Sequence, residues 1–227
     1  MNRAFAGARA VFLDMNGVLV FGHDRLSSDE DFFANYQACG VKTLDAATVV
    51  PAVSQAVAEL ARLYAGGLRD VCFPSVFEVL CEQGQAQAEA QLLADVIAAH
   101  ELGSLSAEAR RVVPQLARQF DLTLISNLWS SPARWRRHFD DAGIDRCFRA
   151  MVFSSDIAMN RPAPAIFEHA LRLAGADAAT TVMVGDDLHR DLAPAAALGM
   201  RAVWVTASGT TQLGVDAVVR IIGELVA

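Results

Sequence analysis

Short apolar runs with the character of strands alternate with helical patterns over most of this chain. The runs lie at 10–14, 121–126, 150–153, 180–184 and 201–205. The helical patterns at 132–142, 163–174 and 190–198 are each followed at once by a glycine, the usual residue just past a helix end. Strands that alternate with helices of this length form parallel β-α-β units. We therefore predict an α/β fold with a doubly wound, mostly parallel sheet.

The stretch 26–105 departs from this alternation, because it is rich in Ala, Gln, Glu and Leu and has little strand signal. Helical periodicity is present in Ala52–Tyr64 and in Ala86–His100. We predict a small α-helical domain at 26–105, inserted into a core domain made of 1–25 and 106–227. An insertion after the first strand stands over the carboxyl edge of the sheet, so this domain is expected to form a cap.

Composition and charge narrow the classes of partner. The chain has 227 residues, a net charge of −7 and no block of basic residues, which disfavours nucleic acid or an anionic membrane as the main partner. The four cysteines form no CxxC pair and are expected to be buried, reduced thiols. We find no signal-peptide pattern and no apolar run long enough to span a membrane. We expect a cytoplasmic protein, either a monomer or a homodimer.

Polar side chains follow the first two apolar runs. The first run ends in Asp14, and Asn16 and Gly17 follow two and three residues after it. Open α/β sheets keep their active sites at the carboxyl edge, so Asp14 is a candidate nucleophile. The second run ends in Ser126, followed by Asn127. A hydroxyl group with free backbone N–H groups at such a position suits a phosphate oxygen.

A cation and three acids lie farther along the chain. Arg161 precedes a proline-started helix and could neutralise an anion at the same edge of the sheet. The carboxylates of Asp186, Asp187 and Asp191 would repel one another unless a cation or hydrogen bonds offset the cost. Clusters of oxygen donors of this kind suit Mg²⁺. Trp129 could line the mouth of the pocket or pack beneath the helical domain.

The order and spacing of these segments resemble the haloacid dehalogenase (HAD) superfamily, in its phosphatase-like branch with a helical cap inserted after the first motif. The matching segments are Phe12–Leu19, Ile125–Asn127, Arg161–Phe167 and Gly185–Asp187 with Asp191. The resemblance covers nearly the whole chain. It implies a HAD-type, Rossmann-like core.

The resemblance also implies a role for each matching residue. Asp14 would be the nucleophile that forms an aspartyl intermediate, Ser126 would bind the transferring phosphoryl group, and Arg161 would carry the charge that most members assign to a lysine. Asn127 and Trp129 join Ser126 and Arg161 as expected substrate contacts. The implied Mg²⁺ ligands are Asp14, the backbone carbonyl of Asn16 and Asp186, with Asp187 or Asp191 completing the acidic shell.

Asn16 departs from the phosphatase pattern. The family's phosphatases carry an aspartate two residues after the nucleophile, which protonates the leaving group and then activates water. Asn is nearly isosteric with Asp, but its side chain cannot accept a proton. Because positioned acid/base catalysis contributes roughly 10²–10⁴-fold, we expect a Mg²⁺-dependent phosphatase of a small phosphorylated metabolite whose turnover is slowed by about that factor.

Three other functions stay open at this point. A carbon–halogen hydrolase also works without the second aspartate, because halide leaves unprotonated, although the acidic cluster argues for a cation. A non-catalytic relative would bind a phosphorylated ligand or a protein partner. A phosphonate-cleaving enzyme would need a lysine in the cap, and Lys42 is the single lysine of the chain.

Overall fold

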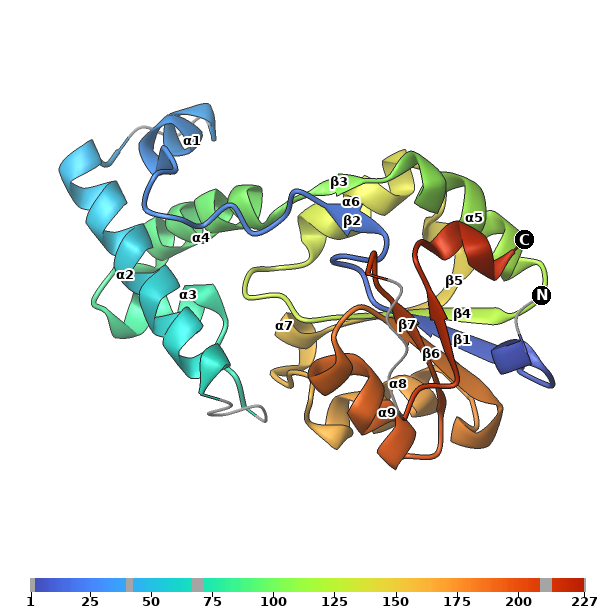
Figure 1. The fold of residues 1–227 in the computed structure, drawn as a ribbon. Helices are drawn as coiled ribbons and strands as arrows, with labels where there is room; N and C mark the ends of the chain where they lie inside the picture. The colour runs from blue at the N-terminus through green and yellow to red at the C-terminus, as the bar shows by residue number, and fades with distance from the viewer. Residues whose placement is uncertain (1–2, 40–42, 67–71, 209–213, 227) are drawn as a thin grey trace.

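The computed structural model describes residues 3–39, 43–66, 72–208 and 214–226, which form an α/β unit joined to a bundle of helices (Figure 1). The main sheet of the described chain has six parallel strands in the order β5-β4-β1-β6-β7-β8. These strands are β1 (Ala10–Leu13), β4 (Asp121–Ser126), β5 (Phe148–Phe153), β6 (Thr181–Gly185), β7 (Arg201–Val205) and β8 (Ala217–Val219). The predicted α/β fold with a parallel sheet is confirmed, and β8 is an additional short strand at one edge.

Helices cover both faces of this sheet. One face packs against α5 (Ala107–Ala117) and α6 (Ala133–Asp141), and the other packs against α8 (Pro164–Ala174) and α9 (Ala193–Ala197). The side chains of β1 alternate between the two hydrophobic layers, since Leu13 belongs to the first layer and Phe12 to the second. Burial on both faces explains why β1 is apolar throughout. A short helix, α7 (Ser154–Ile157), follows β5.

Most of the expected helix boundaries are close to those observed, with two exceptions. The helix α2 (Ala46–Ala65) begins before the predicted segment Ala52–Tyr64. Pro164 starts α8, and Gly175 ends it in the left-handed conformation with φ 63°. The helix expected at 190–198 is instead a π-helical turn, Leu188–Leu192, followed by α9. Pro194 is one physical reason for the irregular start, because proline lacks the backbone N–H that a continuous helix would use.

The described part of the stretch between β2 (Val20–Phe21) and β3 (Ser104–Leu105) is mostly helical. It contains α1 (Phe32–Ala38), α2 (Ala46–Ala65), α3 (Val76–Glu82) and α4 (Gln87–Glu101). These helices enclose a hydrophobic cluster of their own, in which Tyr36, Leu60 and Ile97 are buried. Among the described residues, none of the helices combines the length and the apolar character that crossing a bilayer requires. We refer to α1–α4 as the helical bundle.

Two chain crossings connect the helical bundle to the α/β unit, and they run side by side (Figure 1). β2 (Val20–Phe21) and β3 (Ser104–Leu105) form an antiparallel pair in which Val20 faces Leu105. Farther out, the Arg25 N–H donates to the His100 carbonyl oxygen at 3.0 Å. This paired connection leaves the bundle beside the carboxyl edge of the main sheet.

The cysteines lie at less buried positions than expected. Cys72 is exposed, and Cys39, Cys81 and Cys147 are half-buried and free. Cys81 and Cys147 pack only against the borders of hydrophobic clusters. The expectation of buried thiols is therefore wrong.

Candidate active site

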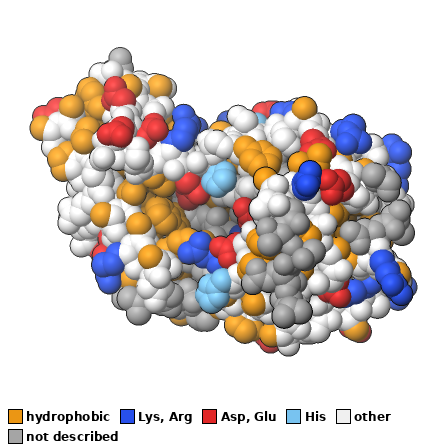
Figure 2. Space-filling view, viewed as in Figure 1, with side chains coloured by type: hydrophobic (Ala, Val, Ile, Leu, Met, Phe, Trp, Pro, Cys, Tyr) orange, Lys and Arg blue, Asp and Glu red, His pale blue; other side chains and the backbone are white. Residues whose placement is uncertain are grey.

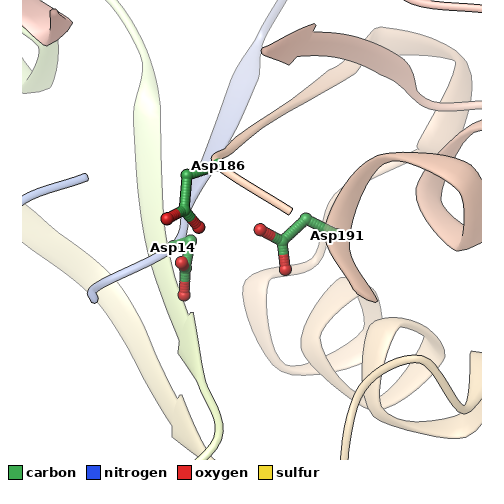
Figure 3. A group of neighbouring side chains, drawn as sticks. All are labelled: Asp14, Asp186 and Asp191. Atoms are coloured by element: carbon green, nitrogen blue, oxygen red, sulfur yellow. The ribbon is translucent and has the colours of Figure 1, made fainter. Parts of the chain in front are cut away.

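Two neighbouring strands each end next to an aspartate. In the register of β1 and β6, Leu13 pairs with Val184, and the Asp14 N–H donates to the Val184 carbonyl oxygen at 2.9 Å. Asp186 directly follows the last residue of β6. The two aspartates therefore lie together at the carboxyl edge, and the π-helical turn adds Asp191 (Figure 3). One carboxylate oxygen from each of these three residues lies within 4.8 Å of the other two.

Arg161 binds two of the three carboxylates. Its Nη2 atom lies 2.8 Å from Oδ1 of Asp14, and its Nη1 atom lies 2.5 Å from Oδ1 of Asp191. Only 5% of Arg161, 3% of Asp14 and 1% of Asp191 is exposed, so these charges are screened little by water. From the sequence we expected Arg161 to neutralise an anion at this edge of the sheet, and the structure shows that it contacts two protein anions.

The electrostatics of the cluster show an excess of negative charge. Burial raises the pKa of Asp14 to about 7, although the Arg161 guanidinium acts in the opposite direction. Burial likewise raises the pKa of Asp191 to about 7 and also raises the pKa of Asp186. One guanidinium therefore does not offset three ionised carboxylates.

The residues of this cluster fit a divalent cation such as Mg²⁺. The donors are all oxygen atoms, which Mg²⁺ prefers, and a bound cation would relieve the repulsion among the carboxylates. Gly17, with φ 79°, leaves room for the cluster, because a Cβ atom there would lie 2.0 Å from Oδ2 of Asp186. Asn16 lies in the same turn, and its side-chain Oδ1 atom is buried without a hydrogen-bond partner among the described residues.

Asp187 does not join the three clustered carboxylates. Its Oδ1 atom accepts hydrogen bonds from the backbone N–H groups of His189 and Arg190, at 2.8 and 2.9 Å. It therefore caps the π-helical turn. The Asp187 N–H donates to Oδ2 of Asp191 at 3.1 Å, which helps to hold that carboxylate in the cluster. Asp187 and Asp191 were both candidate metal ligands from the sequence, and the geometry favours Asp191.

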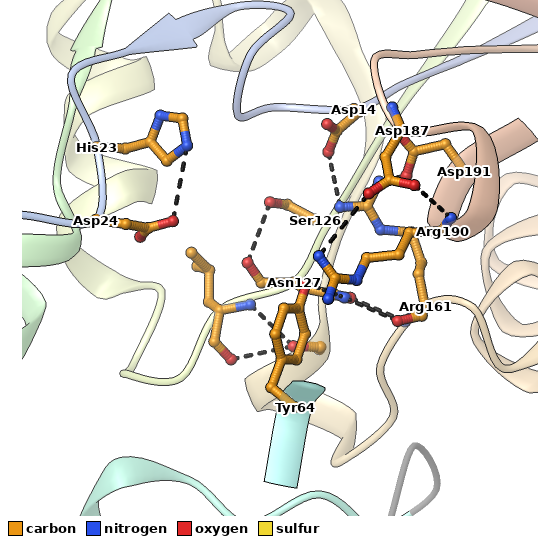
Figure 4. Close-up of polar contacts among 12 residues, drawn as sticks. Asp14, His23, Asp24, Tyr64, Ser126, Asn127, Arg161, Asp187, Arg190 and Asp191 are labelled. Atoms are coloured by element: carbon orange, nitrogen blue, oxygen red, sulfur yellow. Dashed lines mark hydrogen bonds and ion pairs between the residues drawn. The ribbon is translucent and has the colours of Figure 1, made fainter. Parts of the chain in front are cut away.

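Asn127 holds the main chain at Arg161. Its Oδ1 atom accepts from the Arg161 N–H at 2.9 Å, and its Nδ2 atom donates to the Arg161 carbonyl oxygen at 3.0 Å. The same Nδ2 atom donates to the Tyr64 hydroxyl at 3.0 Å (Figure 4). Asn127 therefore connects β4, the Arg161 segment and the end of α2.

Ser126 and Trp129 were both expected to contact substrate, but only Trp129 lines the cavity. Ser126 is fully buried outside the cavity wall, and its hydroxyl donates to the Asn127 carbonyl oxygen at 3.5 Å. Its contact with a phosphoryl group stays a prediction. Trp129 lines the cavity and also packs edge-on against Tyr64, with ring centroids 6.0 Å apart. Both interpretations offered for Trp129 therefore describe its position.

A cavity of about 680 Å³ opens above the carboxylates. Figure 2 shows the hollow between the helical bundle and the α/β unit, with acidic and basic side chains around it. Its wall includes residues that were not predicted from the sequence: His23, Asp24, Tyr64, Glu101, Arg190 and Trp204. The sequence patterns do not single out these residues as a site, because residues of the bundle and its connections meet Arg190 and Trp204 only when the bundle packs beside the sheet.

Glu101 is the most buried of these additional acids. Its carboxylate accepts hydrogen bonds from the Trp129 N–H at 2.8 Å and from the Ser130 N–H at 3.0 Å, and it also contacts the Ser130 hydroxyl. Burial nevertheless raises the pKa of Glu101 to about 7, and the nearby carboxylate of Asp24 contributes in the same direction. Glu101 therefore joins the second chain crossing to the loop after β4.

Comparison with known proteins identifies the class of protein to which this fold and site belong. A family model described as haloacid dehalogenase-like hydrolase matches residues 8–199. The chain belongs to this family. The resemblance stated from the sequence motifs is thereby confirmed.

Among curated proteins, the chain is similar to the phosphoserine phosphatase of Thermus thermophilus, at 30% identity over 150 residues. It is also similar to the N-acylneuraminate-9-phosphatase of Mus musculus, at 28% identity over 110 residues. These alignments cover 63% and 48% of this chain. They span about half the length of the relatives, 56% and 44% respectively.

Among solved structures, the 2-haloacid dehalogenase of Pseudomonas syringae pv. Tomato DC3000 has a TM-score of 0.62 and 25% identity, with 96% of each chain covered. The HAD phosphatase of Thermococcus onnurineus has a TM-score of 0.61 and 19% identity, with 96% of this chain and 95% of that chain covered. The second similarity concerns the fold. Relatives with phosphatase and dehalogenase names thus share this architecture.

Proposed function

We propose that this hydrolase is a Mg²⁺-dependent phosphomonoesterase of a small phosphorylated metabolite, with Asp14 as its nucleophile. The observation that carries the proposal is the meeting of Asp14, Asp186 and Asp191 around Arg161 at the base of the cavity. Phosphatase names among the curated relatives support it. The helical bundle would act as the cap over this site.

In the proposed reaction, an Asp14 carboxylate oxygen forms a bond to phosphorus while the bond from phosphorus to the ester oxygen breaks. Arg161 favours the ionised form of Asp14 and holds one of its oxygens in place. Water then hydrolyses the aspartyl-phosphate and regenerates the carboxylate. Asp14, Asp186 and Asp191 would hold Mg²⁺, which supplies positive charge that favours the approach of the phosphate to the acidic site.

Asn16 is expected to slow the first step of this reaction. The departing ester oxygen needs a proton, and the Asn16 amide cannot supply one as a carboxylic acid does. Substrates whose leaving groups are stable as anions, such as the acyl phosphate acetyl phosphate and the ester p-nitrophenyl phosphate, need this proton least. We therefore expect turnover to be fastest with such substrates.

The direct test is release of inorganic phosphate from acetyl phosphate and p-nitrophenyl phosphate, with Mg²⁺ or with a chelator. The proposal expects release only with Mg²⁺, and Asp14→Asn should abolish it. An active Asp14→Asn variant, or release that persists in the chelator, would contradict the proposal. A complete lack of release by both wild type and Asn16→Asp would favour the ligand-binding alternative.

A carbon–halogen hydrolase is the second candidate. Asn16 favours it, because halide needs no proton to leave, and the dehalogenase structure at 25% identity supports it. The clustered carboxylates favour the phosphatase, since they fit a cation that carbon–halogen cleavage does not need. Halide release from 2-chloropropionate in the presence of a chelator distinguishes the two functions. The phosphonate-cleaving alternative depended on Lys42, which lies outside the described residues.

A further inference from the structure

More acidic than basic side chains line the cavity. Six acids line its wall: Asp14, Asp24, Glu101, Asp186, Asp187 and Asp191. Two arginines among the described residues line it as well, and Arg161 is engaged by two carboxylates. Arg190 is the other, and no hydrogen bond from its guanidinium to a protein acceptor is present in the described chain. A substrate anion that needs an arginine would therefore find donors at Arg190.

Arg190 is held in place by an aromatic ring from the opposite side of the cavity. Its guanidinium carbon lies 4.0 Å from the centre of the Tyr64 ring, which belongs to α2 of the helical bundle. Tyr64 is itself fixed by the hydrogen bond from Asn127 (Figure 4). Stacking on a ring face restrains the guanidinium while its N–H groups, which lie in the guanidinium plane, stay available.

The nearest acid does not satisfy these donors. The Nη1 atom of Arg190 lies 3.8 Å from Oδ2 of Asp187, which is too long for a hydrogen bond. The other oxygen of Asp187 already accepts two backbone N–H groups. Arg190 is also half-buried, so a ligand in the cavity would meet a partly desolvated cation.

We propose that Arg190, stacked on Tyr64, binds a carboxylate group that the substrate carries in addition to its phosphate. The planar guanidinium offers paired donors that match the two oxygens of a carboxylate. The substrate class is thereby narrowed to phosphorylated carboxylic acids. This inference deepens the proposed function and rests on it for the position of the phosphate at the Asp14 cluster.

The test measures binding, so it does not depend on turnover. Wild-type protein in saturating Mg²⁺ is titrated calorimetrically with phosphonoacetate, 3-phosphonopropionate and 4-phosphonobutyrate. Each is compared with the alkylphosphonate in which a methyl group replaces the carboxylate: ethyl-, propyl- and butylphosphonate. The series covers several spacings between the two anionic groups. We expect at least one carboxylate ligand to bind about 10-fold or more tightly than its partner, as a charge-assisted bond would give.

Two variants of Arg190 and one control variant test whether Arg190 causes this preference for a carboxylate. Arg190→Gln should reduce the ratio of affinities to about 1, whereas Arg190→Lys should keep part of it. Arg62→Gln is the matched control, because Arg62 is an exposed arginine near the same end of α2 that pairs with Glu59 outside this cavity. The control should keep the full preference.

Two results would overturn the inference. One is the absence of any carboxylate preference in the wild type for all three spacings. The other is a preference that survives in Arg190→Gln, which would leave Arg190 only as a contact between the bundle and the core. Failure of the proposed function gives a different result, namely no phosphate release from any ester, and the ratio of phosphonate affinities is measured independently of it.

Discussion

The Nη2 atom of Arg161 lies 2.8 Å from Oδ1 of Asp14, and both side chains are buried at the carboxyl edge of the sheet. A buried carboxylate of this kind depends on its partner, because its interaction with water has been lost. The same guanidinium contacts Asp191 through its other terminal nitrogen. Arg161 is therefore a structural requirement for the acidic cluster, whatever substrate binds there.

Removing Arg161 should lower stability strongly. We expect Arg161→Ala to reduce the free energy of unfolding by about 3–5 kcal/mol in metal-free protein, because two buried carboxylates lose their counter-charge. Arg161→Lys should be less damaging, since an ammonium group keeps the charge but not the two-pronged contact. Urea denaturation with and without Mg²⁺ measures both effects. An Arg161→Ala variant as stable as the wild type would show that the ion pairs contribute nothing.

Restoring an acid at position 16 should accelerate the reaction. We expect Asn16→Asp to raise kcat for an alkyl phosphate by roughly 10²–10⁴-fold, because a carboxyl group can donate a proton to the leaving alcohol. The gain with p-nitrophenyl phosphate should be smaller. Parallel measurements of kcat on both substrates check this difference, and an equal gain on both would argue against a role in leaving-group protonation.

Gly17 should be required for Mg²⁺ binding. In Gly17→Ala, the new Cβ atom would displace the Asp186 carboxylate, whose Oδ2 atom lies 2.0 Å from that position. Gly143→Ala is the matched control, since Gly143 has φ 70° but no atom within 4 Å of its Cβ position. Both variants should lose about 1–2 kcal/mol of stability from the left-handed backbone. Only Gly17→Ala should weaken the Mg²⁺-induced rise in Tm, and equal effects on that rise would contradict this explanation.

Substitutions of Asp187 and Asp191 should have different effects on stability and on Mg²⁺ binding. Asp187→Ala should lower the free energy of unfolding by about 1 kcal/mol, because it removes a side-chain cap. Its Mg²⁺ dissociation constant should stay near the wild-type value. Asp191→Asn should raise that constant instead. Isothermal titration calorimetry measures the Mg²⁺ dissociation constants of both variants. A raised constant in Asp187→Ala with an unchanged constant in Asp191→Asn would show that Asp187 is the ligand instead.

Glu101 should make stability depend on pH. Its folded-state pKa of about 7 is above the ordinary glutamate value of 4.5, so the folded protein binds its proton more tightly than the unfolded chain does. The contribution of Glu101 protonation to the free energy of unfolding is therefore fully present below about pH 4.5, and it is lost as the pH rises to about 7. In Glu101→Gln this loss should vanish.

The measurement is the difference in unfolding free energy between Glu101→Gln and wild type across that range. Relative to wild type, the variant should gain on the order of 1–3 kcal/mol from pH 5 to pH 8. The slope is diagnostic, because the amide also lowers stability at every pH by facing the Trp129 N–H donor. Parallel curves for the two proteins would show that Glu101 does not titrate in this range.

Local sequence patterns determine the main sheet and several helix ends. The strand β1 was predictable because an apolar run with both faces buried can be recognised without tertiary information. Pro164 and Gly175 likewise set the ends of α8 through their own backbone preferences. Asp14 and Asp186 could be placed at one edge, because parallel strands bring their carboxyl ends together.

Only the tertiary structure decided what these residues contact. The spacing of Asp187 and Asp191 was equally suitable for a metal, and the direction of each side chain at the π-helical turn distinguished them. Ser126 was expected at the site and is buried, whereas Arg190 and Tyr64 were not selected and meet across the cavity. Their meeting depends on how the bundle packs beside the sheet. Contacts between residues so distant in sequence arise from packing, which no local propensity encodes.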